Sequence, residues 1–114
     1  MTNSEHKQYL KNFMQQLHEE RFYDAHESLE AIWFPKRFEE CDETRLIKGF
    51  INAAVCFELI KKGKIDASHR VWKTYLKYEP LLHKVNSEHL SDYQTIALHV
   101  QKIKSKLDIN PTSV

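Results

Sequence analysis

The sequence predicts an all-α fold, an antiparallel helical bundle of about five helices in which the third helix is central and buried. Only two glycines and three prolines stand among the 114 residues, whereas sandwiches and barrels need turn residues about every ten positions. Apolar residues instead recur at helical spacing along the chain. Because 41% of the residues are apolar, enough for one modest core, we expect residues 1–114 to form a single domain with a frayed tail at 108–114.

The first two predicted helices cover residues 3–19 and 24–33. Thr2 and Glu5 have the spacing of a capping box, in which each residue bonds the other's backbone N–H. Asp24 is the predicted N-cap of the second helix, since short acidic side chains accept from the free N–H groups of a first turn. The short segment between the two helices indicates that they pack antiparallel.

A loop is expected at 34–43, with Phe34 and Phe38 tucked against the bundle. The third helix, at 44–62, is apolar nearly all round, which is typical of a helix that is covered on every side. Gly63 follows it, at the position where a helix usually ends in a left-handed residue. These features together make the third helix the centre of the predicted bundle.

The fourth predicted helix covers residues 66–79, with Asp66 as its N-cap. Pro80 either ends this helix or starts a short extra turn at 80–85, because proline is tolerated only at the beginning of a helix. The fifth predicted helix covers 91–107. No repeat of a solenoid period occurs.

Charge and targeting features limit the partners. Seventeen basic residues against sixteen acidic ones give a net charge of +1, so we expect no nucleic-acid partner, which would require a basic stripe. No stretch approaches the roughly 18 apolar residues of a membrane span, so no membrane partner is expected. The first residues lack an export signal, and two cysteines cannot form a disulfide framework, which favours a cytoplasmic location. Eleven leucines and thirteen aromatic residues are compatible with a homodimer, although no face requires one.

The most informative segment is Tyr23-Asp-Ala-His-Glu-Ser-Leu-Glu-Ala-Ile-Trp33. His26 and Glu30 are one helical turn apart, so their side chains can meet. Glu27 points about 100° away from His26 and is expected to serve the start of the helix. His26 is therefore a candidate metal ligand or general base that Glu30 orients or assists. The competing interpretation is a half-buried histidine whose hydrogen bonds are satisfied by a carbonyl or a carboxylate, and it is the commoner outcome of such a pattern.

Three residues of the third predicted helix stand out. Glu58 lies on an apolar face, either opposite His26 as an acid, base or ligand, or in an ion pair with Lys62 worth only ~0.3–0.5 kcal/mol if exposed. Asn52 is expected to bond a neighbour. Gly49 stands in mid-helix, where glycine costs ~1 kcal/mol relative to alanine. Close approach of another helix is the usual reason for such a glycine.

Several familiar sites are excluded by spacing. The zinc-protease pattern His-Glu-x-x-His fails because Glu30 occupies its fifth position. A di-iron bundle needs two Glu-x-x-His repeats, and no glutamate here has a histidine three residues later. Cys41 and Cys56 form no Cys-x-x-Cys pair. The remaining histidines have no mutual ligand spacing, and we expect most of them at the surface: His6, His18, His69, His83, His89 and His99.

The segment from Tyr23 to Trp33 resembles the Ala-His-Glu-x-Leu-Glu-x-x-Trp signature of the domain of unknown function 309 (DUF309) family. Leu46-Ile-Lys-Gly-Phe-Ile-Asn-Ala-Ala-Val is similar to that family's Gly-Leu-Ile-Gln-x-Ala helix, and Lys62-Gly63-Lys64 is similar to its Arg-Gly-Asn turn. The resemblance covers about residues 10–78. It implies an all-helical bundle with a site near the signature, and it names no reaction.

The sequence departs from the family pattern at three positions. Asn52 stands where glutamine is usual, Glu58 where histidine is usual, and Lys64 where asparagine is usual. The change to Glu58 matters most, because a carboxylate cannot replace a histidine that titrates near neutral pH. This departure favours a structural polar network over a shared catalytic chemistry.

Two functional hypotheses follow. The first is a small binding or interaction protein in which a buried polar network surrounds the signature, with these motif residues: Tyr23, His26, Glu27, Glu30, Trp33, Gly49, Asn52 and Glu58. The alternative is a small metal-assisted or acid–base hydrolase in which His26, Glu30 and Glu58 face one pocket, with a divalent metal as candidate cofactor. We favour the first because no complete catalytic set occurs, and the sequence leaves open whether the protein is an enzyme.

Overall fold

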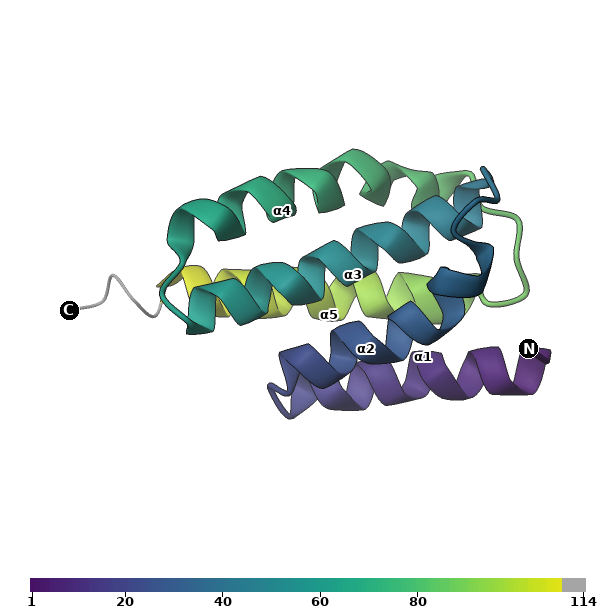
Figure 1. The fold of residues 1–114 in the computed structure, drawn as a ribbon, viewed down its shortest axis with the longest axis horizontal. Helices are drawn as coiled ribbons and strands as arrows, with labels where there is room; N and C mark the ends of the chain where they lie inside the picture. The colour runs from purple at the N-terminus through teal and green to yellow at the C-terminus, as the bar shows by residue number, and fades with distance from the viewer. Residues whose placement is uncertain (110–114) are drawn as a thin grey trace.

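The computed structural model describes residues 1–109, and this part of the chain forms five α-helices, two short 3₁₀ segments and no strand (Figure 1). The α-helices are α1 (Asn3–His18), α2 (Phe22–Trp33), α3 (Asp42–Lys61), α4 (Ile65–Tyr78) and α5 (Leu90–Ile109). The 3₁₀ segments, Phe34–Lys36 and Glu79–His83, follow α2 and α4. The predicted all-α class is therefore confirmed.

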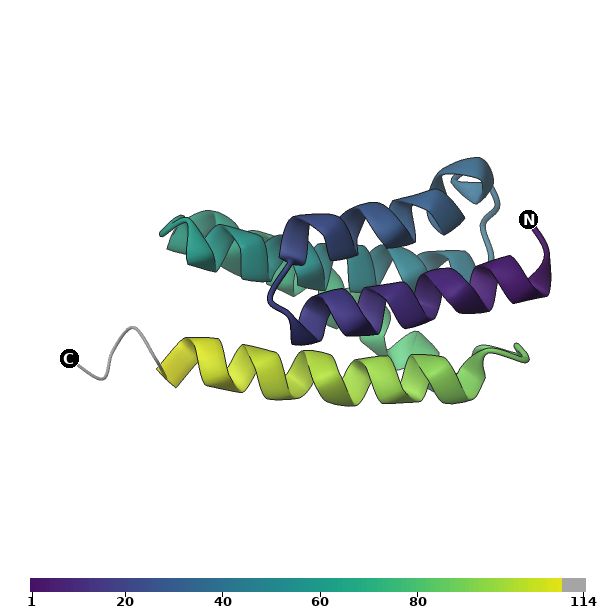
Figure 2. The ribbon, with the colours of Figure 1, turned by 90° about the horizontal axis from the view of Figure 1, so that it is seen from below.

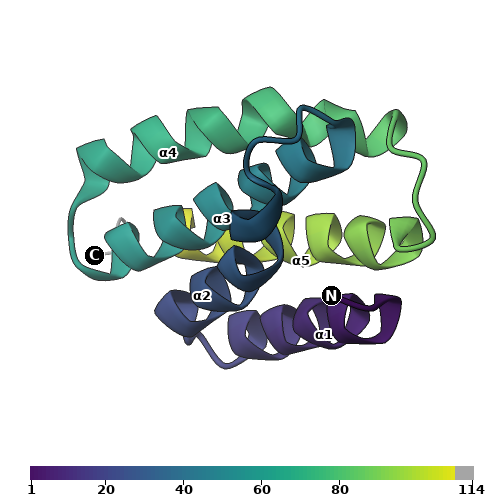
Figure 3. The ribbon, with the colours of Figure 1, turned by 45° about the vertical axis from the view of Figure 1, so that its right-hand side comes forward.

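The helices form a bundle around α3. Helices α2, α4 and α5 pack against α3, and α1 packs against α2 and α5 (Figure 3). Each helix runs antiparallel to the one before it, as predicted (Figures 1 and 2). A consequence is that α1, α3 and α5 all begin at the same end of the bundle.

Helix α3 is central because other helices cover most of its circumference. Ten of its twenty residues are buried, against two of the fourteen in α4. A Cβ built on Gly49 would lie 2.9 Å from the Cβ of Tyr78 on the α4 side, which is closer than real Cβ contacts. The mid-helix glycine therefore lies where α3 and α4 approach closely, as expected.

The helix starts agree only partly with the capping predictions. The capping box at Thr2 is present, with its hydroxyl oxygen 3.1 Å from the Glu5 backbone nitrogen and the Glu5 carboxylate 3.0 Å from the Thr2 backbone nitrogen. Asp24 and Asp66 are not N-caps, because α2 begins two residues and α4 one residue before the predicted start. Acidic residues favour the whole first turn through the helix dipole, so their presence alone does not locate the cap.

Both α1 and α3 are followed by a residue in the left-handed backbone conformation. Gly63 has φ +75°, as its position predicted, and Glu20 after α1 has φ +59°. The turn after α1 is closed by a hydrogen bond of 2.8 Å from the Arg21 N–H to the Gln16 carbonyl. A residue with a Cβ adopts this conformation at a cost of about 1 kcal/mol.

The connection after α2 corrects one prediction. Phe34 and Phe38 are not tucked against the bundle, since they are 54% and 84% exposed. The guanidinium carbon of Arg37 lies 3.7 Å from the Phe34 ring centre and 4.6 Å from that of Phe38. The two rings are therefore covered in part by a cation rather than by the core, which the helices already fill.

In the C-terminal third, the helical segments agree with the prediction and α5 reaches slightly further along the chain. Pro80 lies in the 3₁₀ segment Glu79–His83, so it starts a short turn as one of the two alternatives proposed. Helix α5 reaches Ile109, two residues beyond the predicted end, and the rest of the tail predicted to fray, 110–114, lies outside the described residues. None of the helices in residues 1–109 combines the length and the apolar character that crossing a membrane requires.

Candidate functional site

The polar residues of the signature lie on the outer side of α2. The inner side packs into the core through Ala25, Leu29 and Ile32, which are buried. The outer side, followed by the first residue of the 3₁₀ turn, presents a phenol, an imidazole, two carboxylates and a phenyl ring. We call this set the motif surface, and its members are Tyr23, His26, Glu27, Glu30 and Phe34.

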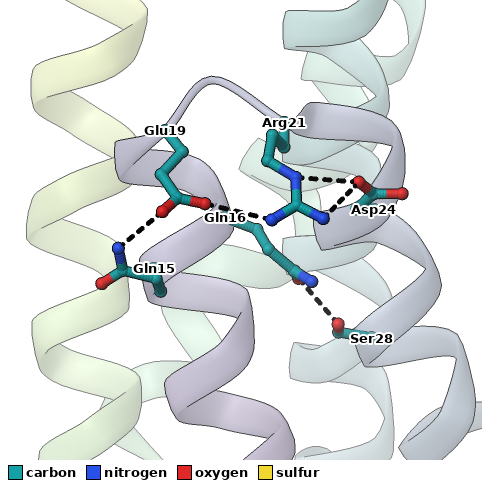
Figure 4. Close-up of polar contacts among 6 residues, drawn as sticks. All are labelled: Gln15, Gln16, Glu19, Arg21, Asp24 and Ser28. Atoms are coloured by element: carbon teal, nitrogen blue, oxygen red, sulfur yellow. Dashed lines mark hydrogen bonds and ion pairs between the residues drawn. The ribbon is translucent and has the colours of Figure 1, made fainter.

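Polar contacts at the α1–α2 turn fix the start of α2 (Figure 4). The Arg21 guanidinium lies 3.1 Å from the Glu19 carboxylate and 2.9 Å from that of Asp24. The Ser28 hydroxyl oxygen lies 2.7 Å from the Gln16 side-chain amide. Exposed ion pairs contribute little stability each, so we assign them mainly to orienting the first turn of α2 against α1.

His26 and Glu30 meet as the sequence predicts. The Nε2 of His26 lies 3.2 Å from the Oε1 of Glu30, and the two side chains are 22% and 30% exposed. A carboxylate only accepts, so the imidazole Nε2 donates and the Nδ1 of a neutral ring carries no proton. That Nδ1 is buried and has no hydrogen-bond partner in residues 1–109. The nitrogen available to take a proton is therefore shielded from solvent.

Tyr23 and Glu27 form a second contact one turn apart on the same helix. The Tyr23 ring stands edge-on to the His26 ring, with centres 5.7 Å apart and an interplanar angle of 88°. A hydrogen bond with Glu27 and the charge of that carboxylate raise the pKa of the Tyr23 phenol. Glu27 therefore interacts with Tyr23.

A shallow hollow of about 420 Å³ opens on the motif surface, lined by His26, Glu27, Glu30, Ala31 and Phe34. Within residues 1–109, no lysine or arginine forms an ion pair with Glu27 or Glu30. Carboxylates and the face of an aromatic ring both attract cations. The hollow therefore combines two groups suited to a positively charged ligand.

Glu58 lies apart from His26 and Glu30. Its carboxylate is 3.1 Å from the Lys62 ammonium, one turn later on α3. It lines a different hollow, of about 360 Å³, together with Tyr23 and Lys61. Among residues 1–109, no three His, Cys, Asp or Glu side chains are grouped closely enough to hold a metal ion.

The other motif residues lie between the helices. The Lys48 ammonium is 4.2 Å from the centre of a Trp33 ring, and the Asn52 side-chain amide donates to the Lys48 carbonyl at 2.9 Å. Gly49 faces Tyr78 on α4. Trp33 and Gly49 therefore serve the packing of α3 against α2 and α4, whereas the bond of Asn52 stays within α3.

A buried polar cluster lies elsewhere, where α1, α3 and α5 begin, and the sequence did not reveal it. We call it the N-terminal cluster, and it consists of His6, Glu43, Ser87, His89 and Tyr93. The His6 and His89 rings stack with centres 4.0 Å apart and planes 3° apart, and both residues are only 6% exposed. The expectation of a surface position is therefore wrong for these two histidines.

A chain of hydrogen bonds connects the residues of the N-terminal cluster. The Tyr93 hydroxyl donates to Glu43 Oε2 at 2.5 Å, and the Ser87 hydroxyl donates to the same oxygen at 2.7 Å. The Nε2 of His6 lies 2.9 Å from the Tyr93 oxygen. Because the single phenolic proton already goes to Glu43, the His6 Nε2 must carry the proton and donate. The Nε2 of His89 is buried without a partner in the described residues.

Burial and these hydrogen bonds shift the pKa values of His6, Glu43 and Tyr93. Burial, followed by the charge of His89, lowers the pKa of His6 to about 4. Burial alone would raise the pKa of Glu43, but the hydrogen bonds from Tyr93 and Ser87 outweigh it and lower that pKa. Burial and the Glu43 carboxylate raise the pKa of Tyr93. The cluster therefore contains a neutral imidazole and a stabilised carboxylate at neutral pH.

One sequence signal for this cluster existed. His6 continues the apolar series Leu10, Phe13 and Leu17 of the first helix, and all four residues are buried. A histidine at a core position of the helical pattern is expected to be buried. Its partners could not be identified, because Tyr93 is 87 residues away in the chain.

Comparison with known families agrees with the resemblance. A family model described as a domain of unknown function (DUF309) matches residues 10–71, more than half of the 114 residues. The match includes the whole motif surface, and His6, Ser87, His89 and Tyr93 fall outside it. Neither the curated proteins nor the solved structures gave a match to this chain.

Proposed function

The chain belongs to the DUF309 family, and we propose that it is a binding protein whose motif surface recognises a positively charged segment of a partner protein. One observation carries this proposal. The polar residues of the signature, His26, Glu27 and Glu30, lie on the outer side of α2, while Ala25 and Leu29 of the same signature fill the core. The outer face of a surface helix is ordinarily polar, so packing does not require these particular groups, and we assign them to recognition.

The chemistry of the surface supports a cationic partner. Glu27 and Glu30 contact Tyr23 and His26 on their own helix and have no lysine or arginine partner in the described residues, so no lysine or arginine balances their charges. The contact of Arg37 with the Phe34 ring, at 3.7 Å, is an internal example of a guanidinium on this aromatic. Exposed cation–π contacts contribute about 0.5–1 kcal/mol and charged hydrogen bonds about 1.5–3 kcal/mol. A site of this size is suited to weak, reversible binding.

The hydrolase alternative has less support. A general base needs a proton-accepting atom that its substrate can reach, and the free Nδ1 of His26 is buried. Glu58, the third proposed catalytic group, is bonded to Lys62 and lines another hollow. A zinc ion would need at least one further ligand beside His26 and Glu30, since structural and catalytic zinc sites use three or four protein groups.

The proposal is tested by a nuclear magnetic resonance titration of ¹⁵N-labelled protein with the peptide acetyl-Gly-Arg-Gly-Arg-Gly-amide. The matched probe is the same peptide with citrulline, the neutral analogue of arginine. We expect saturable shifts of the amides of residues 22–34 with the arginine peptide and none with the citrulline peptide. Equal binding of both peptides, or no saturable shift with either, would contradict the proposal.

Two double variants identify which carboxylates bind the arginine peptide. Glu27→Gln with Glu30→Gln removes two charges from the motif surface, and we expect at least tenfold weaker binding of the arginine peptide. The control, Glu39→Gln with Glu40→Gln, removes two charges from exposed residues of the α2–α3 connection. Equal loss in both double variants would mean that only overall charge matters, and the motif surface would not be the site.

A further inference from the structure

We propose a second binding site, for a small amphiphilic anion such as a carboxylate on a short apolar chain, in a hollow beside the C-terminal half of α5. Helix α5 extends past the turn that joins α1 to α2 (Figures 1 and 2). A hollow of about 250 Å³ lies there, lined by residues from the end of α1, the start of α2 and α5. This site is separate from the motif surface and does not depend on the function proposed for it.

The floor of the hollow is apolar. It consists of Leu17 from α1, Phe22 from α2, and Ile103 and Leu107 from α5. Leu17, Phe22 and Leu107 are buried residues of the hydrophobic core, and Ile103 packs against that core. Pockets for drug-sized ligands have volumes of about 300–1,000 Å³, so this hollow accommodates the apolar body of a smaller molecule.

The rim is polar and carries two lysines. Lys102 and Lys106 stand one turn apart on α5, so their ammonium groups lie on one side of the helix. His18 and His99 add two imidazole rings. Glu20 is the one carboxylate among the lining residues. A ligand that covers the apolar floor therefore meets positive groups at the edge.

The single carboxylate at the rim is already engaged. Glu20 lies 2.8 Å from the Lys61 ammonium and 3.8 Å from that of Lys106. Lys102 forms no ion pair within the described residues. Lys61 and Lys106 thus share one glutamate and Lys102 has no carboxylate partner among the described residues, so positive charge exceeds negative charge at this rim. An anionic head group on an apolar body is the ligand chemistry that satisfies both the floor and the rim.

The experiment is a titration of ¹⁵N-labelled protein with octanoate, with acetate and octan-1-ol as matched probes. Acetate carries the charge without the apolar chain, and octan-1-ol carries the chain without the charge. We expect octanoate to give saturable shifts at the amides of Leu17, Phe22, Ile103 and Leu107. We expect octan-1-ol to bind at least tenfold more weakly and acetate to give no saturable shift.

Two double variants test the rim. Lys102→Gln with Lys106→Gln should weaken octanoate binding at least tenfold without changing the fold, because both lysines are exposed. Lys73→Gln with Lys77→Gln removes a matched, exposed pair one turn apart on α4, and it should change the affinity less than twofold.

Four results would overturn the proposal. They are the absence of saturable octanoate shifts, equal affinity for octanoate and octan-1-ol, equal weakening by both double variants, and shifts centred on Leu76 and Leu98. The last two residues line a separate groove of about 480 Å³ between α4 and α5, where an apolar chain would bind without needing the lysines of α5.

Discussion

The motif surface and the N-terminal cluster share three residue types and differ in their surroundings. Each contains histidine, tyrosine and glutamate. On the motif surface the His26–Glu30 pair is half-exposed, whereas His6 and His89 are buried and stacked. Buried polar groups are costly unless they are bonded, and when bonded they rigidify a core. The comparison teaches that burial, more than residue type, separates a stabilising network from a surface available for recognition.

The two regions also differ in their relation to the family. The motif surface lies entirely within the matched residues 10–71, and four of the five members of the N-terminal cluster lie outside them. The cluster joins the starts of α1, α3 and α5 through hydrogen bonds that span 44 to 87 residues of sequence. The family match therefore covers the motif surface and leaves most of the N-terminal cluster outside it.

The largest expected effect is that of Tyr93→Phe. This change removes the hydroxyl that bonds both His6 and Glu43. The buried His6 Nε2 then has no partner, which costs about 1–3 kcal/mol, and Glu43 keeps only its bond from Ser87. We expect a loss of about 2–4 kcal/mol in the free energy of unfolding, measured by urea denaturation. The control is Tyr23→Phe on the motif surface, where the hydroxyl is exposed and a change below about 0.5 kcal/mol is expected. Equal losses of stability in the two variants would mean that the two tyrosine hydroxyls contribute equally, which would contradict the prediction.

The second effect is a dependence of stability on pH that arises in the N-terminal cluster. Burial lowers the pKa of His6 most, the charges of His89 and Lys36 lower it further, and the charges of Glu43 and Asp92 raise it. The result is a pKa of about 4 in the folded protein, against an ordinary value of 6.5. Between these two pH values the unfolded chain binds a proton that the folded protein does not bind, so stability falls as the pH falls.

The size of this effect follows from the span of pH. We expect the free energy of unfolding to decrease by about 2 kcal/mol between pH 7 and pH 5. Glu43, whose pKa is also lowered, would add to the loss only below this range. Urea denaturation at both pH values measures the change, and His6→Gln serves as the comparison because glutamine keeps an N–H donor and does not titrate. A variant with the same pH dependence as the parent would assign the effect to another group.

A smaller effect tests the packing of the matched region itself. Gly49→Ala gains about 1 kcal/mol of helix propensity, but the new Cβ would lie 2.9 Å from the Tyr78 Cβ. Overpacking typically costs about 1–3 kcal/mol, so we expect a net loss of about 1 kcal/mol in thermal or urea unfolding. A gain in stability would mean that α3 and α4 separate easily at this point.

Local sequence patterns predicted the contacts within a single helix and the backbone conformation at helix ends. The contact of His26 with Glu30, the left-handed Gly63 and the close approach at Gly49 all follow from spacing or from backbone chemistry, and the contacts agree. The apolar character of the third helix likewise predicted that α3 is central.

What the sequence missed depends on tertiary structure. The stack of His6 on His89 requires α1 and α5 to be placed side by side, and no local pattern specifies that. Phe34 and Phe38 were expected to be tucked against the bundle, but Arg37 covers their rings at the surface instead. Helices α2 and α4 begin before the predicted residues because aspartate suits both the N-cap and the first turn of a helix, so its position does not distinguish the two.

The most direct test compares the same substitution in the two regions, His6→Ala and His26→Ala, by urea denaturation at pH 7. We predict that His6→Ala lowers the free energy of unfolding by about 2–4 kcal/mol, because it leaves the Tyr93 oxygen and the His89 ring without their buried partner. We predict a loss below about 1 kcal/mol for His26→Ala, whose contact with Glu30 is a half-exposed pair within one helix. A loss for His26→Ala that equals or exceeds that for His6→Ala would contradict the account and make the signature a structural network.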